Sequence, residues 1–435
     1  MQYDNYRTGC YSSTLFVLVR KNSYLSQERT MAVTAALVAR PPGERRSRLR
    51  IWSAAWPIAA VFVLANAATP LYVLWQDEFG FDKSTLTAVF CCYMAGMALA
   101  LLVSGVTSDR LGRKAVLIPA LVLAIAAGLL FAAAPSILAL FVARTLTGIA
   151  SGAMVSAGVA AVTDIAGPAG TRSAALAGAV GIAVGTGLGP LLGGVLSETV
   201  PGPTVTVFLL ETLFLLVALA IVTLVPIPRT GAGAGAAWIR VPRVPRPNRR
   251  QLLVAVTVAG AALTTTAFML SLAPSLLSEL LGTTNRIVAG ALACLTFAVA
   301  TGSQFALRGL PVRRLLLVSV AGTIMCVATL VVAVDTSSVA GLTVAAILAG
   351  TAYGPGMLGG LALLNAHIPA GRLAEANAAL NIGAYAFAGL LILALGFLSD
   401  HLGFAVGVTL FALVAATAAL AGGSLVVAGL RAGRE

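Results

Sequence analysis

Charged residues are scarce in this chain: Asp, Glu, Lys and Arg make up only 10% of its 435 residues, whereas 59% are hydrophobic. Soluble proteins carry about a quarter charged residues, so water cannot be the solvent for most of this chain's surface. The apolar runs are long and do not alternate with polar residues, which favours membrane-spanning helices over the short alternating strands of a membrane barrel. The composition therefore predicts an all-α polytopic membrane protein.

Residue types that perform catalysis or bind metals are also few. Histidine occurs twice, no Ser/His/Asp or metal-ligand grouping is visible, and no Walker phosphate loop is present. The five cysteines include no CxxC pair, and four of them lie in apolar stretches, which indicates buried small hydrophobes. We therefore expect no enzyme activity, no metal site, no cofactor and no ATP-driven step.

Long apolar runs organise the chain. Runs of about 19 residues or more can each cross a bilayer as a helix, and they fall into two sets of six. The first set covers 52–74, 85–106, 115–133, 137–163, 173–195 and 204–225, and the second covers 253–277, 287–307, 315–334, 338–366, 373–396 and 402–429.

These runs predict the domain boundaries. We expect a cytoplasmic N-terminal extension (1–50), a six-helix bundle (51–227), a basic linker rich in Pro, Gly and Arg (228–251), a second six-helix bundle (252–430) and a short cytoplasmic tail (431–435). Met31 opens a stretch that is more typical of the start of such a protein. One hypothesis is therefore that residues 1–30 are not native.

The basic residues predict the topology. When the loops alternate between two sides, most of the 28 Lys and Arg residues fall on one side, and only Lys83 and Arg286 fall on the other. The positive-inside rule then places both termini and the linker in the cytoplasm. We therefore expect a multi-pass protein of the plasma membrane, which in a bacterium is the inner membrane. The net charge of +13 is spread over short loops without a patch of stacking aromatics, so we expect no nucleic-acid partner.

The two halves resemble each other at a spacing of about 202 residues. Gly148 and Gly152 match Gly350 and Gly354. The stretch Gly194-Val-Leu-Ser-Glu198 matches Gly396-Phe-Leu-Ser-Asp400. Such matches indicate a duplicated six-helix unit, which is how transporters with a midplane site between two rocking halves are built.

The loop between the second and third spans reads Gly105-Val-Thr-Ser-Asp109-Arg110-Leu-Gly112-Arg113-Lys114. A helix ends here in an acid, turns on a glycine and restarts beside two cations. The segment resembles motif A of the major facilitator superfamily, G-x-x-x-D-R-x-G-R-K/R. The resemblance implies that Asp109 meets the end of the eleventh span and that Arg113 pairs with Asp164, forming a latch that stabilises the outward-facing state. The alternative is that Arg113 and Lys114 only anchor the loop in the cytoplasm.

Two charged residues, one basic and one acidic, lie deep inside predicted spans. An arginine within a span is costly and normally faces a cavity or a partner. Arg144 opens the stretch Arg144-Thr-Leu-Thr-Gly148-Ile-Ala-Ser-Gly152, which resembles motif B of the same superfamily and implies proton coupling; the alternative is snorkelling to the headgroups. Glu211 is the only acid deep in a span, and it is a candidate carrier of the coupled proton, although the sixth span is usually peripheral in this fold.

The fifth span carries a glycine at every fourth position, which lines one helix face and permits close contact with another helix. These residues are Gly181, Gly185, Gly189 and Gly193, followed by Gly194, and Pro190 adds a local bend. The run resembles motif C of drug-proton antiporters, G-x-x-x-G-P-x-x-G-G, which implies export. The longer form of that motif expects a glycine where Leu176 stands, and the alternative reading of the run is simple helix packing.

Polar and aromatic residues of two spans are candidate substrate contacts. In this superfamily the first span lines the central cavity, so the resemblance implies that Asn66, Tyr72 and Trp75 contact the substrate. Asn381 and Tyr385 in the eleventh span, with Asn377, are further candidates. Tyr72 and Trp75 lie near the outer end of their span and equally fit interfacial anchors.

The resemblance covers residues 50–430 and implies the major facilitator fold of twelve helices in two pseudo-symmetric bundles. It implies a monomer of the drug-proton antiporter subgroup that exports a small, hydrophobic or amphiphilic compound by alternating access, driven by a proton gradient. Its partners would be this small-molecule substrate, protons and the lipid bilayer. One alternative is a proton-linked importer or uniporter of a small metabolite, favoured if Leu176 marks a lapsed motif. Another is a non-transporting sensor or scaffold, against which Asp109, Arg113 and Arg144 argue.

Overall fold

The computed structural model describes residues 42–228, 244–280 and 285–428. Residues 1–30, most of the predicted linker and the predicted tail therefore lie outside the described residues. Within the described part, every regular element is a helix, and twelve helical segments are long and apolar enough to cross a membrane. The predicted fold class is confirmed. The described residues from Ile51 onward form one contact unit.

The first six spans comprise nine helical elements. They are α2 (Pro42–Ala67), the 3-10 helix η1 (Thr69–Leu71), α3 (Tyr72–Phe79), α4 (Lys83–Leu111), α5 (Arg113–Ala133), α6 (Ile137–Ala153), the π-helix η2 (Met154–Gly158), α7 (Val159–Thr199) and α8 (Pro203–Leu224). The long α7 contains the end of the fourth span and all of the fifth. A kink at Gly167, whose φ of 63° suits glycine, separates the two.

The last six spans follow the same plan. They comprise the 3-10 helix η3 (Arg246–Asn248), α9 (Arg249–Ser271), α10 (Ala273–Leu280), α11 (Arg286–Leu307), α12 (Val312–Asp335), α13 (Val339–His367), α14 (Ala370–Leu402) and α15 (Phe404–Ala428). The first and seventh spans are both interrupted near the same end, at η1 and between α9 and α10. This shared break extends the internal repeat beyond the spans in which the sequence shows it.

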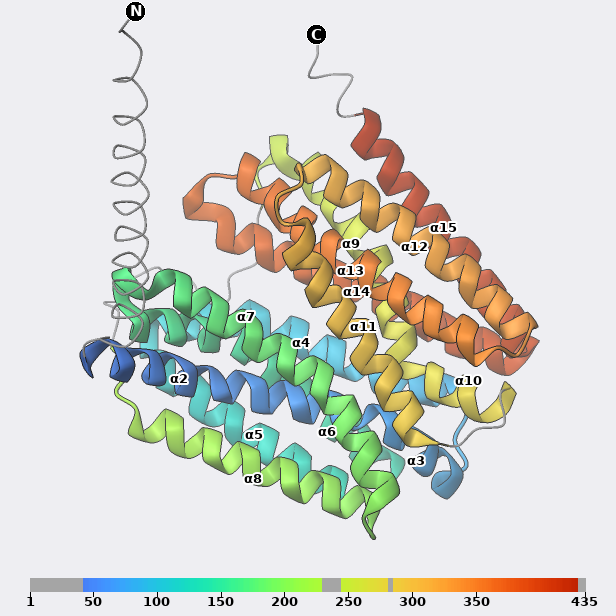
Figure 1. The fold of residues 1–435 in the computed structure, drawn as a ribbon, viewed down its shortest axis with the longest axis horizontal. Coiled ribbons are helices and arrows are strands. Elements are labelled where there is room, and N and C mark those ends of the chain that lie inside the picture. Colours follow the sequence, from blue (N-terminus) through green and yellow to red (C-terminus); the bar gives the residue numbers. More distant parts are fainter. Residues whose placement is uncertain (1–41, 229–243, 281–284, 429–435) are drawn as a thin grey trace, which may run out of the picture. The chain divides into compact units, whose positions relative to one another are not determined.

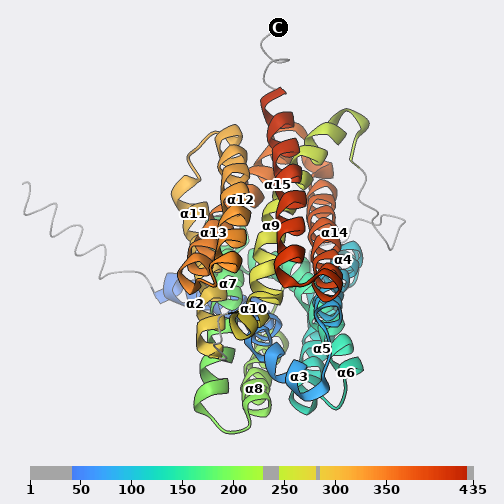
Figure 2. The same cartoon turned by 90° about the vertical axis from the view of Figure 1, so that its right-hand side faces the viewer.

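The two six-helix bundles meet along two pairs of helices. Helix α7 packs against α11, and α4 packs against α14 (Figures 1 and 2). We call the end that carries Asp109, Arg113 and Asp164 the basic end, and the opposite end, which carries Glu198 and Asp400, the acidic end. At the acidic end α3 lies beside α10 (Figure 1). Ser275 Oγ donates a hydrogen bond of 2.8 Å to Gln76 Oε1 there.

The repeated glycines perform the same packing task in each half. A Cβ atom at Gly148 or Gly152 of α6 would overlap the backbone of α4, and one at Gly350 or Gly354 of α13 would overlap the backbone of α11. Small residues let two helix backbones approach closely, which is how helices associate in a membrane. The matched glycines therefore fix the same helix pair, α4 with α6 and α11 with α13, in both bundles.

Candidate functional site

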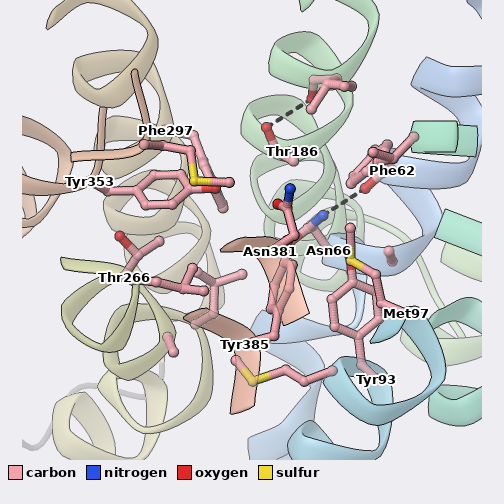
Figure 3. Close-up of a pocket in the computed structure, with 18 of the residues that line it drawn as sticks. Phe62, Asn66, Tyr93, Met97, Thr186, Thr266, Phe297, Tyr353, Asn381 and Tyr385 are labelled. Carbon is pink, nitrogen blue, oxygen red and sulfur yellow. Dashed lines mark hydrogen bonds between the residues drawn. The ribbon is translucent and has the colours of Figure 1, made fainter. Parts of the chain in front are cut away.

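A cavity of about 280 Å³ lies between the two bundles. Its walls come from α2, α4, α6, η2 and α7 of the first bundle and from α9, α11, α13 and α14 of the second. Most of the lining is apolar or aromatic, with rings from both bundles (Figure 3): Phe62, Phe90, Tyr93, Phe297, Tyr353 and Tyr385. A concave, mostly apolar site with a few polar groups is what small-molecule ligands occupy.

Three of the predicted substrate contacts line this cavity. Asn66 comes from α2, and Asn381 and Tyr385 come from α14, so both bundles contribute (Figure 3). Each asparagine uses its Nδ2 to donate a 2.8 Å hydrogen bond to the backbone carbonyl one turn earlier, of Phe62 and Asn377 respectively. This bond fixes each amide in place. Asn377 itself lines a second cavity, at the basic end.

The structure corrects the interpretation of Tyr72 and Trp75. Both side chains are fully buried inside the first bundle, where the Trp75 ring stacks on Phe131 and Phe208 with centroid distances of 5.6 Å and 6.0 Å. Neither residue lines the central cavity, and neither is exposed as an interfacial anchor would be. In this conformation they are packing residues of the first bundle.

Arg144 is a buried cation at the edge of the cavity. Its side chain is only 1% exposed; Nε donates to the Tyr72 hydroxyl and Nη1 donates to the Ala65 carbonyl. The guanidinium carbon also lies 4.9 Å, 6.0 Å and 5.7 Å from the ring centroids of Tyr72, Phe90 and Phe131, within the range of cation–π attraction. Nη2 has no hydrogen-bond partner among the residues that the structure describes. No carboxylate of the described residues pairs with Arg144.

Glu211 lies on the buried face of α8, and its side chain is inaccessible to solvent. Neither carboxylate oxygen has a hydrogen-bond partner within the described residues. Glu211 does not line the central cavity, so the structure does not bring it together with the substrate candidates. Buried carboxylates without partners are costly when ionised, and inside a membrane they are candidates for a proton-carrying role.

At the basic end, Arg113 bridges two acids of its own bundle. Its Nε lies 2.7 Å from Asp164 Oδ2, its Nη1 lies 2.7 Å from Asp109 Oδ1, and it donates a further bond of 2.9 Å to Ser108 Oγ. The chain turns at Gly112, whose φ of 93° favours glycine. These contacts tie the start of α5 to the ends of α4 and the fourth span. We call Asp109, Arg113 and Asp164 the triad.

Helix α14 and the triad face each other across the second cavity. This cavity, of about 300 Å³, is lined by Gly105, Asp109 and Arg113 on one side and by Glu375 and Asn377 of α14 on the other. Among the described residues, the polar contact shown for Asp109 is with Arg113, and no hydrogen bond or ion pair joins Asp109 to α14. Lys114 lies at the start of α5, where its Nζ donates a bond of 2.7 Å to the Thr223 carbonyl of α8, and Arg110 lies in the last turn of α4.

At the acidic end, an acid from each bundle binds the start of a helix of the other bundle. Glu198 Oε1 accepts bonds of 2.8 Å and 2.9 Å from the backbone N–H and Nε of Arg286, the first residue of α11. Asp400 accepts bonds of 3.1 Å and 2.7 Å from the backbone N–H groups of Lys83 and Ser84, at the start of α4. Helix N-termini favour such anions, because their first N–H groups have no partner within the helix. We call these two contacts the twin clamps.

The sequence profile of the Major Facilitator Superfamily matches residues 51–391, which is most of the chain. The chain belongs to this superfamily. It is therefore an integral membrane protein of a transporter family.

Solved structures with the same fold include transporters of several kinds. A mutant of the nucleoside transporter NupG has a TM-score of 0.69 and 13% identity, over 87% of this chain and 99% of that one. A bacterial homolog of the human lysosomal transporter Spinster, inward-facing and occupied, has a TM-score of 0.66 and 14% identity, over 90% and 98%. A D-xylose-proton symporter has a TM-score of 0.67 and 15% identity, over 86% and 96%. Such identities establish the fold alone, and no curated protein matches the chain.

Within this superfamily fold, the glycine face of α7 packs on α2. A Cβ atom at Gly185, Gly189 or Gly193 would overlap the backbone of α2, at the carbonyls of Ala59, Val63 and Ala67. The neighbouring Gly194 faces the other way, against the Arg286 carbonyl of α11, and the Pro190 carbonyl faces Gly290 of α11. Helix α7 is therefore wedged between one helix of its own bundle and one of the other.

Sequence reasoning missed several residues that the structure brings to these sites. Tyr93, Thr266 and Tyr353 line the central cavity, but nothing in their spacing distinguishes them from other residues of apolar spans. The twin clamps had a signal in the sequence, since Glu198 and Asp400 are matched by the repeat. Their partners lie 88 and 316 residues away along the chain, which local patterns cannot reveal.

Proposed function

We propose that this chain is a secondary transporter that exports a small hydrophobic or amphiphilic compound across the plasma membrane in exchange for protons. One observation carries the proposal: a largely apolar cavity is lined by both bundles, with direct interbundle contacts at the acidic end and a second cavity at the basic end. In transporters built from repeats, two halves rock around a central site of this kind and expose it to one side at a time.

The distribution of charge supports an orientation for this proposal. The loops at the basic end carry most of the Lys and Arg residues, and the positive-inside rule assigns such loops to the cytoplasm. The conformation described here is then the inward-facing one. Both termini are cytoplasmic in this proposal, and the triad is the latch that the outward-facing state completes by closing against α14.

The packing of α7 supports export as the direction. In drug-proton antiporters the motif that resembles Gly185 to Gly194 is a feature of exporters, and here its glycines hold α7 against α2. Leu176, which departs from the longer motif, is 45% exposed, so a glycine there is not needed for contact with α2. The departure therefore leaves the packing of the motif intact.

Proton coupling is assigned to Arg144 and Glu211 in this proposal. Arg144 is a buried cation at the cavity wall with one nitrogen unpartnered, and Glu211 is a buried carboxyl with both oxygens unpartnered. Charged groups in such places are rare in membrane spans and mark ion or proton pathways. The proton gradient supplies the energy, and the protein needs no bound cofactor and catalyses no covalent reaction. One chain lines the whole cavity, so a monomer suffices.

Everted membrane vesicles from a pump-deficient bacterial host test this function. Vesicles that contain the chain should accumulate fluorescent amphiphiles when a proton gradient is imposed, and a protonophore should abolish the accumulation. Arg144→Ala should reduce the rate by about tenfold or more, the effect expected for a residue that carries a coupling step. The control is Arg308→Ala, which removes the same charge from an exposed site at the end of α11.

Each alternative has its own signature in the same assay. Uptake that is insensitive to the protonophore contradicts proton antiport, and accumulation inside whole cells under an inward proton gradient identifies an importer. If no compound of a broad panel is transported, the remaining alternative is a non-transporting sensor or scaffold. Glu211→Gln with undiminished proton-driven uptake removes Glu211 from the coupling pathway.

A further inference from the structure

The central cavity carries an unbalanced charge. Among the described residues that line it, Arg144 alone is formally charged; the polar remainder are amides and hydroxyls of residues such as Asn66, Thr266 and Asn381. An arginine side chain keeps its positive charge in proteins. The site that any substrate enters is therefore electropositive.

The cation is held in place but not neutralised. Two of its nitrogens donate to neutral oxygens, of Tyr72 and Ala65, and three aromatic rings surround it. Nη2 is left without an acceptor, and the whole side chain is 1% exposed. A buried charge is stabilised most by an opposite charge at hydrogen-bond distance, and the cavity is the space from which such a group can come.

A second unpartnered group belongs to a residue that lines the cavity from the other bundle. Thr266 of α9 is 2% exposed, and its Oγ1 has no hydrogen-bond partner in the part of the chain that the structure describes. In Figure 3, Thr266 lies near Tyr353, while Asn66 and Asn381 lie together between the two bundles. One orphaned cation and one orphaned hydroxyl thus border a space that is otherwise lined by rings.

The size and surface of the cavity limit the rest of the ligand. Its volume of about 280 Å³ is at the lower end of the roughly 300–1,000 Å³ of ligand pockets, which suits one or two rings. Phe62, Tyr93, Phe297 and Tyr385 offer ring faces and edges for stacking (Figure 3).

We infer that the cavity takes small aromatic monoanions, with the carboxylate of the ligand accepting a hydrogen bond from the Arg144 guanidinium and its ring lying among the aromatic residues. The inference rests on the proposed transport function and narrows its substrate class. A cationic compound meets like charge and finds no carboxylate among the described lining residues, so the cavity discriminates against it.

Three ligands of equal shape test this charge selectivity. The purified full chain in lipid nanodiscs is titrated at pH 7.5 with 2-naphthoate, 2-naphthamide and 2-naphthylmethylammonium, and binding is measured by calorimetry. The carboxylate should bind at least about tenfold more tightly than the amide, and the ammonium should bind most weakly.

Two variants separate the charge of the cavity from its shape. Arg144→Gln should reduce the tenfold preference for the carboxylate over the amide to about twofold or less. Asn381→Asp keeps the shape of a lining residue but adds a negative charge, so it should weaken carboxylate binding about tenfold and strengthen ammonium binding. It also serves if Arg144→Gln does not fold. The control is Gln304→Glu, which adds the same charge on α11 outside the cavity lining and should leave the order unchanged.

The results separate the inference from the transport function. Three outcomes overturn the inference. The unmodified chain binds the ammonium as tightly as the carboxylate or more tightly, it binds none of the three ligands, or neither variant alters its preference for the carboxylate over the amide. Transport is measured separately with radiolabelled 2-naphthoate in proteoliposomes. A chain that binds the carboxylate with the expected order but does not move it refutes the transport function and leaves the assignment of the cavity standing.

Discussion

The acidic end and the basic end of the molecule use their charged residues differently. At the acidic end, Glu198 and Asp400 each bind the first residues of a helix in the other bundle. At the basic end, the charges of the triad bind one another within a single bundle, and a cavity lies between Asp109 and α14. The first set of contacts holds two bodies together, whereas the second braces one body.

The internal repeat is present in one of these arrangements and absent from the other. The twin clamps are related by the repeat, since Glu198 and Asp400 end matching stretches and α4 and α11 begin at matching positions. The loop of the second half that corresponds to the triad, residues 308–314, contains no acid. The contacts at the acidic end therefore follow the internal repeat, whereas the triad occurs in one bundle only.

The largest expected effect comes from preventing closure at the acidic end. In Gly290→Ala the new Cβ atom would overlap the Pro190 carbonyl of α7. Overpacking of this kind costs about 1–3 kcal/mol, and each 1.4 kcal/mol shifts an equilibrium tenfold, so the closed acidic end should become a minor state. We expect transport to fall by about tenfold or more, and spectroscopic distances between the acidic ends of α7 and α11 to lengthen.

The same helix supplies the control for this prediction. A Cβ atom at Gly302 of α11 would meet nothing within 4 Å, so Gly302→Ala should leave both transport and the distances unchanged. Equal behaviour of the two variants would show that close contact of α7 with α11 is not needed in the transport cycle.

The next effect in size separates the two acids of the triad. The side chains of Arg113 and Asp164 are only 11% and 14% exposed, whereas that of Asp109 is 54% exposed. Asp164→Asn should therefore lower the free energy of unfolding by about 1–3 kcal/mol, because a largely buried charge loses its partner. Asp109→Asn should change it by less than about 1 kcal/mol, as expected for an exposed ion pair. Thermal unfolding in detergent measures both.

The transport rates of the triad variants test the proposed latch separately from stability. If Asp109 completes the closed basic end, as proposed, Asp109→Asn should slow transport despite its small effect on stability. Retained folding together with unchanged transport in Asp109→Asn would remove the latch from the mechanism, and the triad would then only stabilise its own bundle.

A smaller effect is expected when the twin clamps lose their charge. Glu198→Gln and Asp400→Asn keep the shape of the side chains, so each should weaken the closed acidic end by about 0.3–1 kcal/mol, which is two- to fivefold in population. The two sites lie on different helix pairs, so the free-energy change of the double variant should equal the sum of the changes in the two single variants. Cross-linking yields at the acidic end report the population. A double variant no more open than either single variant would contradict independent clamps.

Much of the fold is predictable from the sequence because each span is a long apolar run. The breaks in the first and seventh spans were not predicted. Pro70 and Pro274 lie at these breaks, but Pro57, Pro119 and Pro190 lie inside helices that continue, so proline alone does not identify a break. The surrounding helices determine whether a proline interrupts a span, since they can satisfy the backbone groups that proline leaves without a partner.

The candidate substrate contacts of the first span lie in different places in the structure. Asn66 precedes η1 and lines the cavity, but Tyr72 and Trp75 follow it and point into the first bundle. The resemblance implies that the first span lines the cavity, but it does not identify which residues of that span face the cavity. Arg144, Asn381 and Tyr385 line the cavity.

The smallest expected effect tests whether capping within one bundle is separable from clamping between bundles. Asp82 caps α4, the helix whose first N–H groups bind Asp400, and its Oδ1 accepts a 2.8 Å bond from the Thr85 N–H. Hydrogen bonds from the Thr85 side chain and backbone lower the pKa of Asp82 below its usual 3.8. A lowered pKa means that the stabilising effect is complete above pH 3.8 and is lost as the pH falls through the lowered value.

Asp82→Asn should retain the cap, because asparagine is as good a capping residue as aspartate, and at pH 7 it should cost only about 0.3 kcal/mol through the lost charge. As the pH falls below 3.8 towards the lowered pKa, the stabilities of the variant and the unmodified chain should approach each other, and thermal unfolding in a series from pH 7 to pH 3 measures this. The distance between the bundles at the acidic end should not change at either pH in response to this substitution, since Asp82 binds only its own helix. A variant that opens the acidic end as much as Asp400→Asn would show that the cap and the clamp act as one unit.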